Sequence, residues 1–205
     1  MNKFLNKIRS IENEIPITRK IINTILILCF GIVLGTFAKF LDTTASNTLP
    51  FIFEYLDISN FLGRFAIWLL IALYIAIYSH SSIRASLNVL VFFIGMVSSY
   101  YLYSYFVAGF FPKNYAMIWL GFTAISPLLA FVCWYAKGKS KISFILSVII
   151  IAILFKFTFI YGWIYFDVYS ILEVIVFGCA LIALKRNTFR ETTYMILSAV
   201  VIAVI

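Results

Sequence analysis

The stretch RKIINTILILCFGIVLGTFAKFLD, from Arg19 to Asp42, decides the fold of this chain. Two bases open the stretch, a long run without charge follows, and Lys39 and Asp42 stand where that run ends. An apolar run of about 20 residues forms a helix long enough to cross the hydrocarbon core of a bilayer. The stretch therefore predicts a transmembrane helix over Ile21–Leu41 that leaves a basic membrane face and carries two charges to the opposite face.

The composition of the whole chain agrees with a membrane protein. Of its 205 residues, 64% are hydrophobic and only 12% are charged. A water-soluble domain has about half apolar and about a quarter charged residues. A core of this size cannot hide so many apolar side chains from water, so lipid must be the solvent for much of the surface.

Further apolar runs follow along the chain and predict an all-α, polytopic integral membrane protein. We expect residues 21–205 to form a single transmembrane helical domain with about seven spans. Six spans are the alternative, because the last run is short for a bilayer. The runs after the first are Leu62–Ser79, Ala85–Ala108, Tyr115–Ala136, Ile142–Tyr161, Val168–Leu184 and Thr192–Ile205.

Residues 1–20 precede the first span and have an amphipathic pattern. Phe4, Leu5, Ile8 and Ile11 follow one another at helical spacing, with charged residues between them, and Pro16 ends the pattern. This spacing is typical of a short helix lying on a membrane surface. We expect a cytoplasmic amphipathic segment here, and no cleavable signal peptide, because no small-residue cleavage pattern follows the apolar run.

The bases predict the orientation of the chain. Positive residues gather in loops on the cytoplasmic side of membrane proteins. Twelve of the 16 bases fall on the side of the N-terminus, which predicts a multi-pass plasma-membrane protein, of bacterial inner-membrane type, with a cytoplasmic N-terminus. They lie in short loops beside the bilayer, so nucleic acid is not an expected partner. These bases are Lys3, Lys7, Arg9, Arg19, Lys20, Arg84, Lys137, Lys139, Lys141, Lys185, Arg186 and Arg190.

The charges expected on the opposite side are unusual because several stand inside apolar runs. Lys156 lies about five residues before the end of its run, and Glu173 about six residues into the next. At 1.5 Å per residue, both side chains reach about 8–9 Å below that membrane face. A lone charge in hydrocarbon costs about 3 kcal/mol even on the mildest scale. We therefore expect Lys156 and Glu173 to pair, and Lys39 and Asp42 to pair at i,i+3.

Two interpretations of these charges remain open. They are ion pairs that fasten helix ends, or they line a cavity that opens outward. The second interpretation gains support from the hydroxyl-rich segment around Tyr100 and Tyr103, which share one helix face. The candidate ligand-binding residues are Lys39, Asp42, Arg64, Tyr100, Tyr103, Lys156 and Glu173.

Two pairs of small residues are candidates for close helix packing. Gly31 and Gly35 form a GxxxG pattern, and Ala72 and Ala76 have the same spacing. Small residues four apart let two helices approach closely in a membrane. We expect packing within the protein, with the interface to a partner membrane subunit as the alternative.

No residue pattern indicates a metal site, a cofactor or an enzyme. Cys29, Cys133 and Cys179 lie in separate apolar runs, and His80 is the only histidine. An enzyme would need a nucleophile with a base, or a set of metal ligands. Enzymatic activity is therefore not favoured.

Two functions remain. In layout the chain resembles the membrane-embedded binding subunits of energy-coupling-factor transporters, which are small and helical and bind outside under a first loop. The resemblance implies that the protein binds or transports a small polar solute, with energy from a partner subunit. The alternative is an accessory, scaffold or immunity protein that acts through helix–helix contacts.

Overall fold

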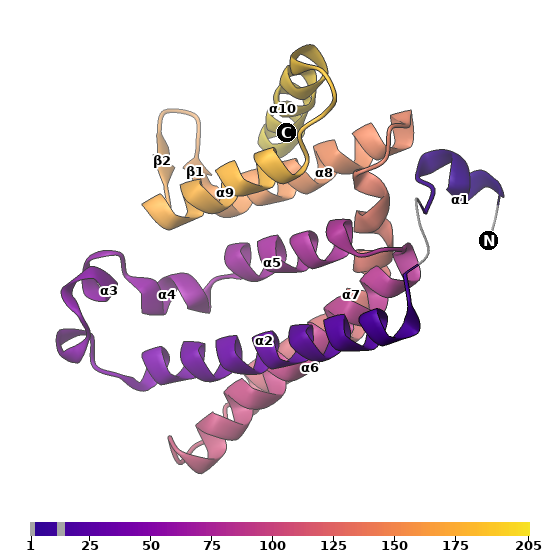
Figure 1. The fold of residues 1–205 in the computed structure, drawn as a ribbon. Coiled ribbons are helices and arrows are strands. Elements are labelled where there is room, and N and C mark those ends of the chain that lie inside the picture. The colour runs from indigo at the N-terminus through magenta and orange to yellow at the C-terminus, as the bar shows by residue number, and fades with distance from the viewer. Residues whose placement is uncertain (1–2, 12–14) are drawn as a thin grey trace.

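A computed structural model describes residues 3–11 and 15–205, and most of them are helical (Figure 1). Helices of very different length follow one another, with one small β-hairpin between α8 and α9. The elements are α1 (Lys3–Ile8), α2 (Ile17–Thr43), the 3-10 turn η1 (Ser46–Thr48), α3 (Phe51–Tyr55), α4 (Ile58–Gly63), α5 (Phe65–Tyr78), α6 (Ser82–Phe106), α7 (Lys113–Ala136), α8 (Lys141–Thr158), β1 (Phe159–Tyr161), β2 (Phe166–Val168), α9 (Ile171–Ala183) and α10 (Phe189–Val204).

The long helices fit a membrane-embedded protein. Four helices, α2, α6, α7 and α8, are long and apolar enough to cross a bilayer, and α5 and α9 are shorter apolar helices. Large apolar side chains such as Val33 on α2 and Leu128 on α7 are exposed on the outside of the molecule. The all-helical class is therefore confirmed, with four helices that could span a membrane, while the count of about seven spans stays a prediction.

The two ends of the molecule can be told apart in Figure 1. One end holds α1 and the turns between α5 and α6 and between α7 and α8; we call it the α1 end. The other holds α3, α4 and the β1–β2 hairpin; we call it the hairpin end. Helices α2 and α6 both finish at the hairpin end, where the charged side chains of interest gather.

Helices α2 and α6 pack closely because three glycines face the contact. A Cβ atom on Gly31 would lie 2.4 Å from the carbonyl oxygen of Phe92, and one on Gly35 would lie 2.1 Å from that of Met96. Gly95 of α6 faces α2 in the same way. The GxxxG surface of α2 is thus occupied inside this chain, and it is the contact that places the end of α2 beside α6.

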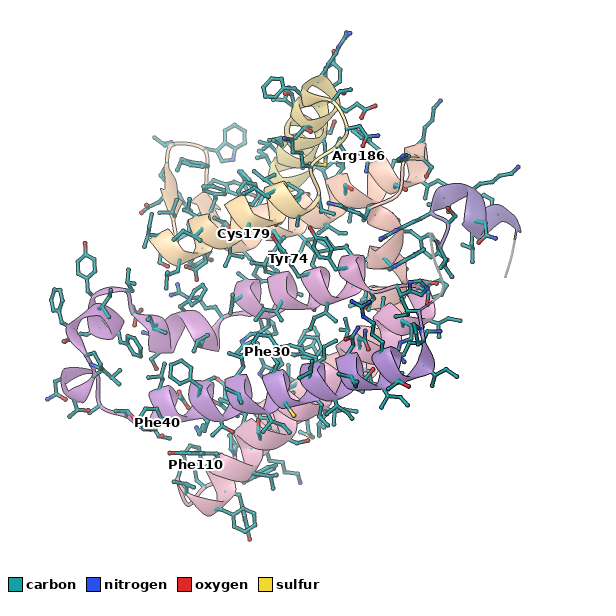
Figure 2. The ribbon with its side chains drawn as sticks, viewed as in Figure 1. Phe30, Phe40, Tyr74, Phe110, Cys179 and Arg186 are labelled. Carbon is teal, nitrogen blue, oxygen red and sulfur yellow. The ribbon has the colours of Figure 1, made fainter. Side chains whose placement is uncertain are left out.

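A second packed region joins α5, α8, α9 and α10. Its core includes Leu73 of α5, Ile151 of α8, Val176 of α9 and Met195 of α10. Figure 2 shows Tyr74 on α5 beside α9, where its hydroxyl donates a hydrogen bond of 3.1 Å to the carbonyl oxygen of Cys179. Helix α5 contacts both packed regions, so it connects the α2–α6 pair to the C-terminal helices.

The described part of the N-terminal segment packs against one end of the bundle, and its place on a membrane surface stays a prediction. Helix α1 ends at Ile8, which is buried against the turn at Gly138, where a Cβ atom would meet the Ile8 carbonyl oxygen at 2.2 Å. Arg9 then donates hydrogen bonds to the carbonyl oxygens of Trp134 (2.7 Å) and Ile77 (3.0 Å), near the ends of α7 and α5. Part of the predicted amphipathic segment, residues 1–2 and 12–14, lies outside the described residues. The described part packs against the bundle because it stabilises two helix C-termini.

Two further basic side chains at the α1 end also donate hydrogen bonds to carbonyl oxygens at helix C-termini. Lys137 donates to the carbonyl oxygen of Ala183 at the end of α9, and Arg186 donates to that of Ala136 at 3.2 Å. Burial, and then the nearby charges of Arg9 and Arg186, lower the pKa of the Lys137 ammonium group. Bases at this end therefore satisfy carbonyl groups that an α-helix leaves unpaired in its last turn.

The hairpin between α8 and α9 was not predicted. Phe159 pairs with Val168 and Tyr161 with Phe166, in antiparallel register. The predicted span over Ile142–Tyr161 therefore ends three residues early, at Thr158. Aromatic and β-branched residues on both sides of a glycine favour a hairpin, and they end the helix here.

Candidate functional site

A cavity of about 320 Å³ lies at the hairpin end, between α2, α4, α5, α6 and α7. It combines one buried cation, one half-exposed carboxylate and six aromatic side chains. Its lining residues are Lys39, Asp42, Leu62, Gly63, Trp68, Met96, Val97, Tyr100, Tyr101, Phe110, Pro112, Tyr115 and Trp119. We call it the Lys39 cavity.

The close packing of α2 on α6 brings Lys39 into this cavity. Lys39 follows Gly35 by one helical turn, so its side chain points toward α6 rather than lipid. Ser59 of α4 donates a hydrogen bond of 3.2 Å to the carbonyl oxygen of Leu41 and holds α4 against the end of α2. The Lys39 side chain is only 2% exposed.

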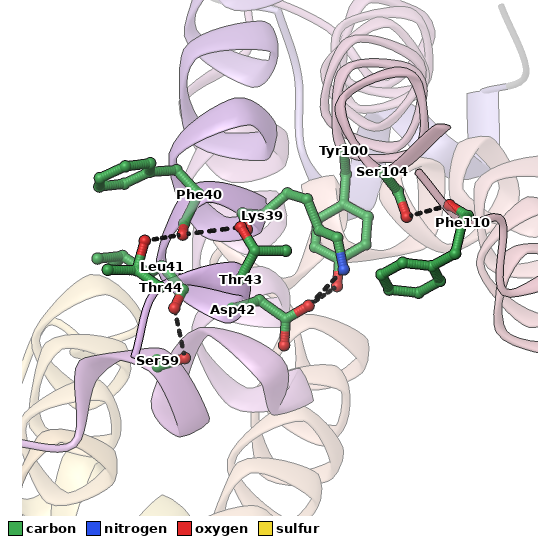
Figure 3. Close-up of polar contacts among 10 residues, drawn as sticks. All are labelled: Lys39, Phe40, Leu41, Asp42, Thr43, Thr44, Ser59, Tyr100, Ser104 and Phe110. Carbon is green, nitrogen blue, oxygen red and sulfur yellow. Dashed lines mark hydrogen bonds and ion pairs between the residues drawn. The ribbon is translucent and has the colours of Figure 1, made fainter. Parts of the chain in front are cut away.

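The polar contacts of Lys39 leave some of its donors without an acceptor (Figure 3). Its Nζ atom lies 2.5 Å from Oδ2 of Asp42, and the Tyr100 hydroxyl donates to the same oxygen at 3.0 Å. An ammonium group has three N–H donors. Within the described chain, Asp42 is the one oxygen acceptor bonded to Lys39. The Asp42 side chain is 50% exposed, so the ion pair reaches solvent on the carboxylate side.

Aromatic rings surround the rest of the Lys39 ammonium group. It lies 4.6 Å from the ring centroid of Phe110 and 5.0 Å from that of Tyr100, within the range of cation–π attraction. Ser104 donates to the carbonyl oxygen of Phe110 at 2.8 Å and fixes the turn that carries this ring, as Figure 3 shows. The positive φ of Gly109, 73°, permits that turn.

Two tryptophans form the deep wall of the cavity. Trp68, from the first turn of α5, donates from Nε1 to the carbonyl oxygen of Leu62 at 2.8 Å. Trp119 of α7 stacks on Phe65, with ring centroids 5.0 Å apart. These two contacts orient the indoles along the wall of the cavity.

Arg64 and Glu173 form a separate and closed ion pair. Nε of Arg64 lies 2.9 Å from Oε1 of Glu173, outside hydrogen-bonding geometry, and Glu173 is fully buried. Ser170 donates to the other carboxylate oxygen and accepts a hydrogen bond from the backbone N–H of Leu172. Asp57 also lies 3.9 Å from Arg64. Neither Arg64 nor Glu173 lines the Lys39 cavity.

The predicted pairing of Lys156 with Glu173 is wrong. Lys156 is exposed, and within the described residues no ion pair joins it to Glu173. Lys156 and Glu173 lie at similar distances from their helix ends, but that distance does not fix the face of the helix on which each residue lies. Phe155 and Thr158 occupy the buried face of α8, so Lys156 points outward, and Arg64 reaches Glu173 instead.

Tyr103 and the pair Ala72 and Ala76 lie outside the Lys39 cavity. Tyr103 borders a shallow groove with Phe37 and Phe40 of α2, on a different side of α6 from the Lys39 cavity. Ala72 and Ala76 line a second, apolar cavity between α5, α6, α7 and α8. The structure therefore brings together Lys39, Asp42 and Tyr100 from the predicted site, and places the other candidates elsewhere.

The sequence carries a signal for one of the misplaced residues, Glu173, but none for the aromatic walls of the cavity. Ser170 and Glu173 stand in the S-x-x-E spacing of a capping box, which assigns Glu173 to the start of a helix rather than to a cavity. The aromatic walls had no such signal, because Trp68, Tyr101 and Trp119 come from three helices and meet only in the fold.

Comparisons with other proteins add no assignment. Within residues 3–11 and 15–205, no three His, Cys, Asp or Glu side chains gather where a metal ion could bind. Searches against protein families, curated proteins and solved structures find no match for this chain.

Proposed function

We propose that this protein spans the membrane about seven times and binds a small polar solute in the Lys39 cavity. The observation that carries the proposal is the Lys39 ammonium group, which is buried, faces a cavity and has one oxygen acceptor for three donors. A buried donor without a partner is costly, and an acceptor group on a ligand removes that cost. Asp42 accepts hydrogen bonds from the donors of the same ligand.

The bases at the α1 end support a cytoplasmic position for that end. The Lys39 cavity then opens on the outer face of the membrane, where it meets solutes from outside. The turns between helices at the α1 end are short, as in Ser79–Ser81 and Lys137–Ser140. Transport would therefore need a partner subunit that couples energy.

The alternative of an accessory protein that acts through helix–helix contacts relied on two small-residue surfaces. Gly31 and Gly35 contact α6 of the same chain, and Ala72 and Ala76 line a cavity. These surfaces are used inside the molecule, so we favour solute binding.

Thermal unfolding of the purified protein tests this function. A panel of small carboxylates, amino acids and sugars is added one compound at a time. A ligand at 100 times its Kd adds about 2.7 kcal/mol, or about 5–10 °C in Tm for a chain of this size. We expect at least one compound to raise Tm, and Lys39→Met to abolish the increase.

Lys156→Met is the matched control, because it makes the same substitution at an exposed lysine near the same end. It should keep the full increase. An increase of equal size in Lys39→Met would show that the compound binds elsewhere and would contradict the proposal.

A further inference from the structure

The second cavity, about 180 Å³ in volume, lies directly behind the tryptophan wall of the Lys39 cavity. Trp68 and Trp119 line both cavities, one on each side of the wall. We call the second cavity the apolar chamber. The two cavities are therefore neighbours, and a ligand that occupied both would have to pass between the two indoles.

The chemistry of the apolar chamber is that of hydrocarbon. Its walls are aliphatic and aromatic side chains such as Ala72, Phe93 and Leu154, with the Ser126 hydroxyl and the Cys133 thiol as the polar exceptions. The Ser126 hydroxyl already donates to the carbonyl oxygen of Thr123 at 2.9 Å. A cavity of this kind stays dry and accepts apolar groups rather than water.

The apolar chamber also opens toward the lipid-facing surface. Phe122 and Leu129 of α7 and Ile153 of α8 line it and are exposed on the outside of the molecule. A hydrocarbon chain can therefore enter between α7 and α8 without crossing a polar layer.

We propose that the ligand is an amphiphile, with a polar head that carries an acceptor oxygen beside Lys39 and a hydrocarbon tail in the apolar chamber. This inference rests on the proposed function, because it takes the Lys39 cavity as the head site. The shared tryptophan wall carries the inference, since it places a polar and an apolar cavity within reach of one molecule. A solute that is polar throughout would leave the apolar chamber unused.

The probe for the test is ω-bromododecanoic acid, which combines a carboxylate head with a tail whose bromine quenches tryptophan fluorescence on contact. The parent protein is Trp163→Phe in phosphatidylcholine nanodiscs, because Trp163 at the hairpin tip is fully exposed. Trp134 is almost completely buried and lines neither cavity, whereas Trp68 and Trp119 line both, so these two indoles report the quenching.

Two variants separate the head from the tail. Ala72→Phe fills the apolar chamber, and we expect about tenfold weaker quenching or more, since each methylene kept out of an apolar site costs about fourfold in affinity. Lys39→Met removes the head contact, and we expect about 10–100-fold weaker quenching, the usual effect of losing a hydrogen bond to a charged group. Lys156→Met should match the parent.

The probe itself supplies a control that does not depend on folding of a variant. Bromododecane has the same tail without a head, and it should quench the parent at least about tenfold less strongly at equal concentration in lipid. Equal quenching by the two probes would mean that bilayer chains fill the apolar chamber without selection for a head, and would overturn the inference.

The remaining outcomes distinguish the two proposals. Unchanged quenching in Ala72→Phe, with quenching lost in Lys39→Met, would overturn the amphiphile and leave the head site in place. Unchanged quenching in Lys39→Met, together with a Tm increase from the stabilising compound of the panel that is as large in this variant as in the parent, would overturn the proposed function itself.

Discussion

The ion pairs Arg64–Glu173 and Lys39–Asp42 lie at the same end and each contain one buried charge, but they differ in what surrounds the carboxylate. Glu173 is fully buried; Ser170 donates a hydrogen bond to one of its oxygens, and the other lies in ion-pair contact with Arg64. Asp42 is half exposed, and both Lys39 and Tyr100 contact one of its oxygens. The first pair is closed to any ligand, while the second borders a cavity. A charge inside an apolar run therefore marks a binding site only where the fold leaves space beside it.

The largest effect should come from breaking the closed pair. Arg64→Met leaves the Glu173 carboxylate buried without its cation, which costs about 3–5 kcal/mol of unfolding free energy. The double variant Arg64→Met/Glu173→Leu should recover most of this loss, because no uncompensated charge remains. Unfolding in mixed detergent micelles measures both. A single variant as stable as the parent would show that Glu173 reaches water.

An intermediate effect should come from the α2–α6 contact, which sets the position of Lys39 but not of Arg64. In Gly35→Ala the new methyl group would meet the backbone of Met96, and we expect a loss of about 1–3 kcal/mol. Gly121→Ala is the matched control, because a Cβ atom there meets no atom within 4 Å. It should gain up to about 1 kcal/mol from helix propensity. Equal stability of both variants would contradict close packing at Gly35.

A smaller effect on stability is expected at the open pair. Lys39→Met leaves Asp42 in contact with solvent and with Tyr100, so the loss should be about 1 kcal/mol or less. The same unfolding measurement compares it with Arg64→Met. A loss as large as that of Arg64→Met would mean that the Lys39–Asp42 pair fastens helices, as the closed pair does.

The smallest effect should be that of Lys156→Met. This side chain is exposed, and exposed substitutions usually change stability by less than about 0.5 kcal/mol. A double-mutant cycle with Glu173→Leu should show no coupling. Coupling above about 1 kcal/mol would restore the pairing that the sequence predicted.

Patterns formed by residues close together in the sequence predicted the long apolar helices and the Lys39–Asp42 ion pair. Apolar runs predicted the helices α2, α6, α7 and α8, because a helix that crosses a bilayer needs about 20 consecutive apolar residues. The pairing of Lys39 with Asp42 followed from their i,i+3 spacing on one helix.

Contacts between distant segments could not be predicted in the same way. Arg64 and Glu173 are far apart in sequence, and only the packing of α5 beside α9 brings them together. The aromatic walls of the Lys39 cavity likewise come from α5, α6 and α7. Residue depth in a membrane is readable from a helix end, but the face that a residue occupies depends on its neighbours in the fold. This is why Lys156 was assigned the wrong partner.

The most direct test compares ligand stabilisation in two variants that each remove one ion pair. The Tm increase caused by the best solute of the panel is measured in Lys39→Met and in Arg64→Met/Glu173→Leu. The account predicts that the increase is lost in Lys39→Met and kept in the Arg64→Met/Glu173→Leu variant, whatever the stability of each without ligand. A full increase in Lys39→Met, with loss in the other variant, would contradict it.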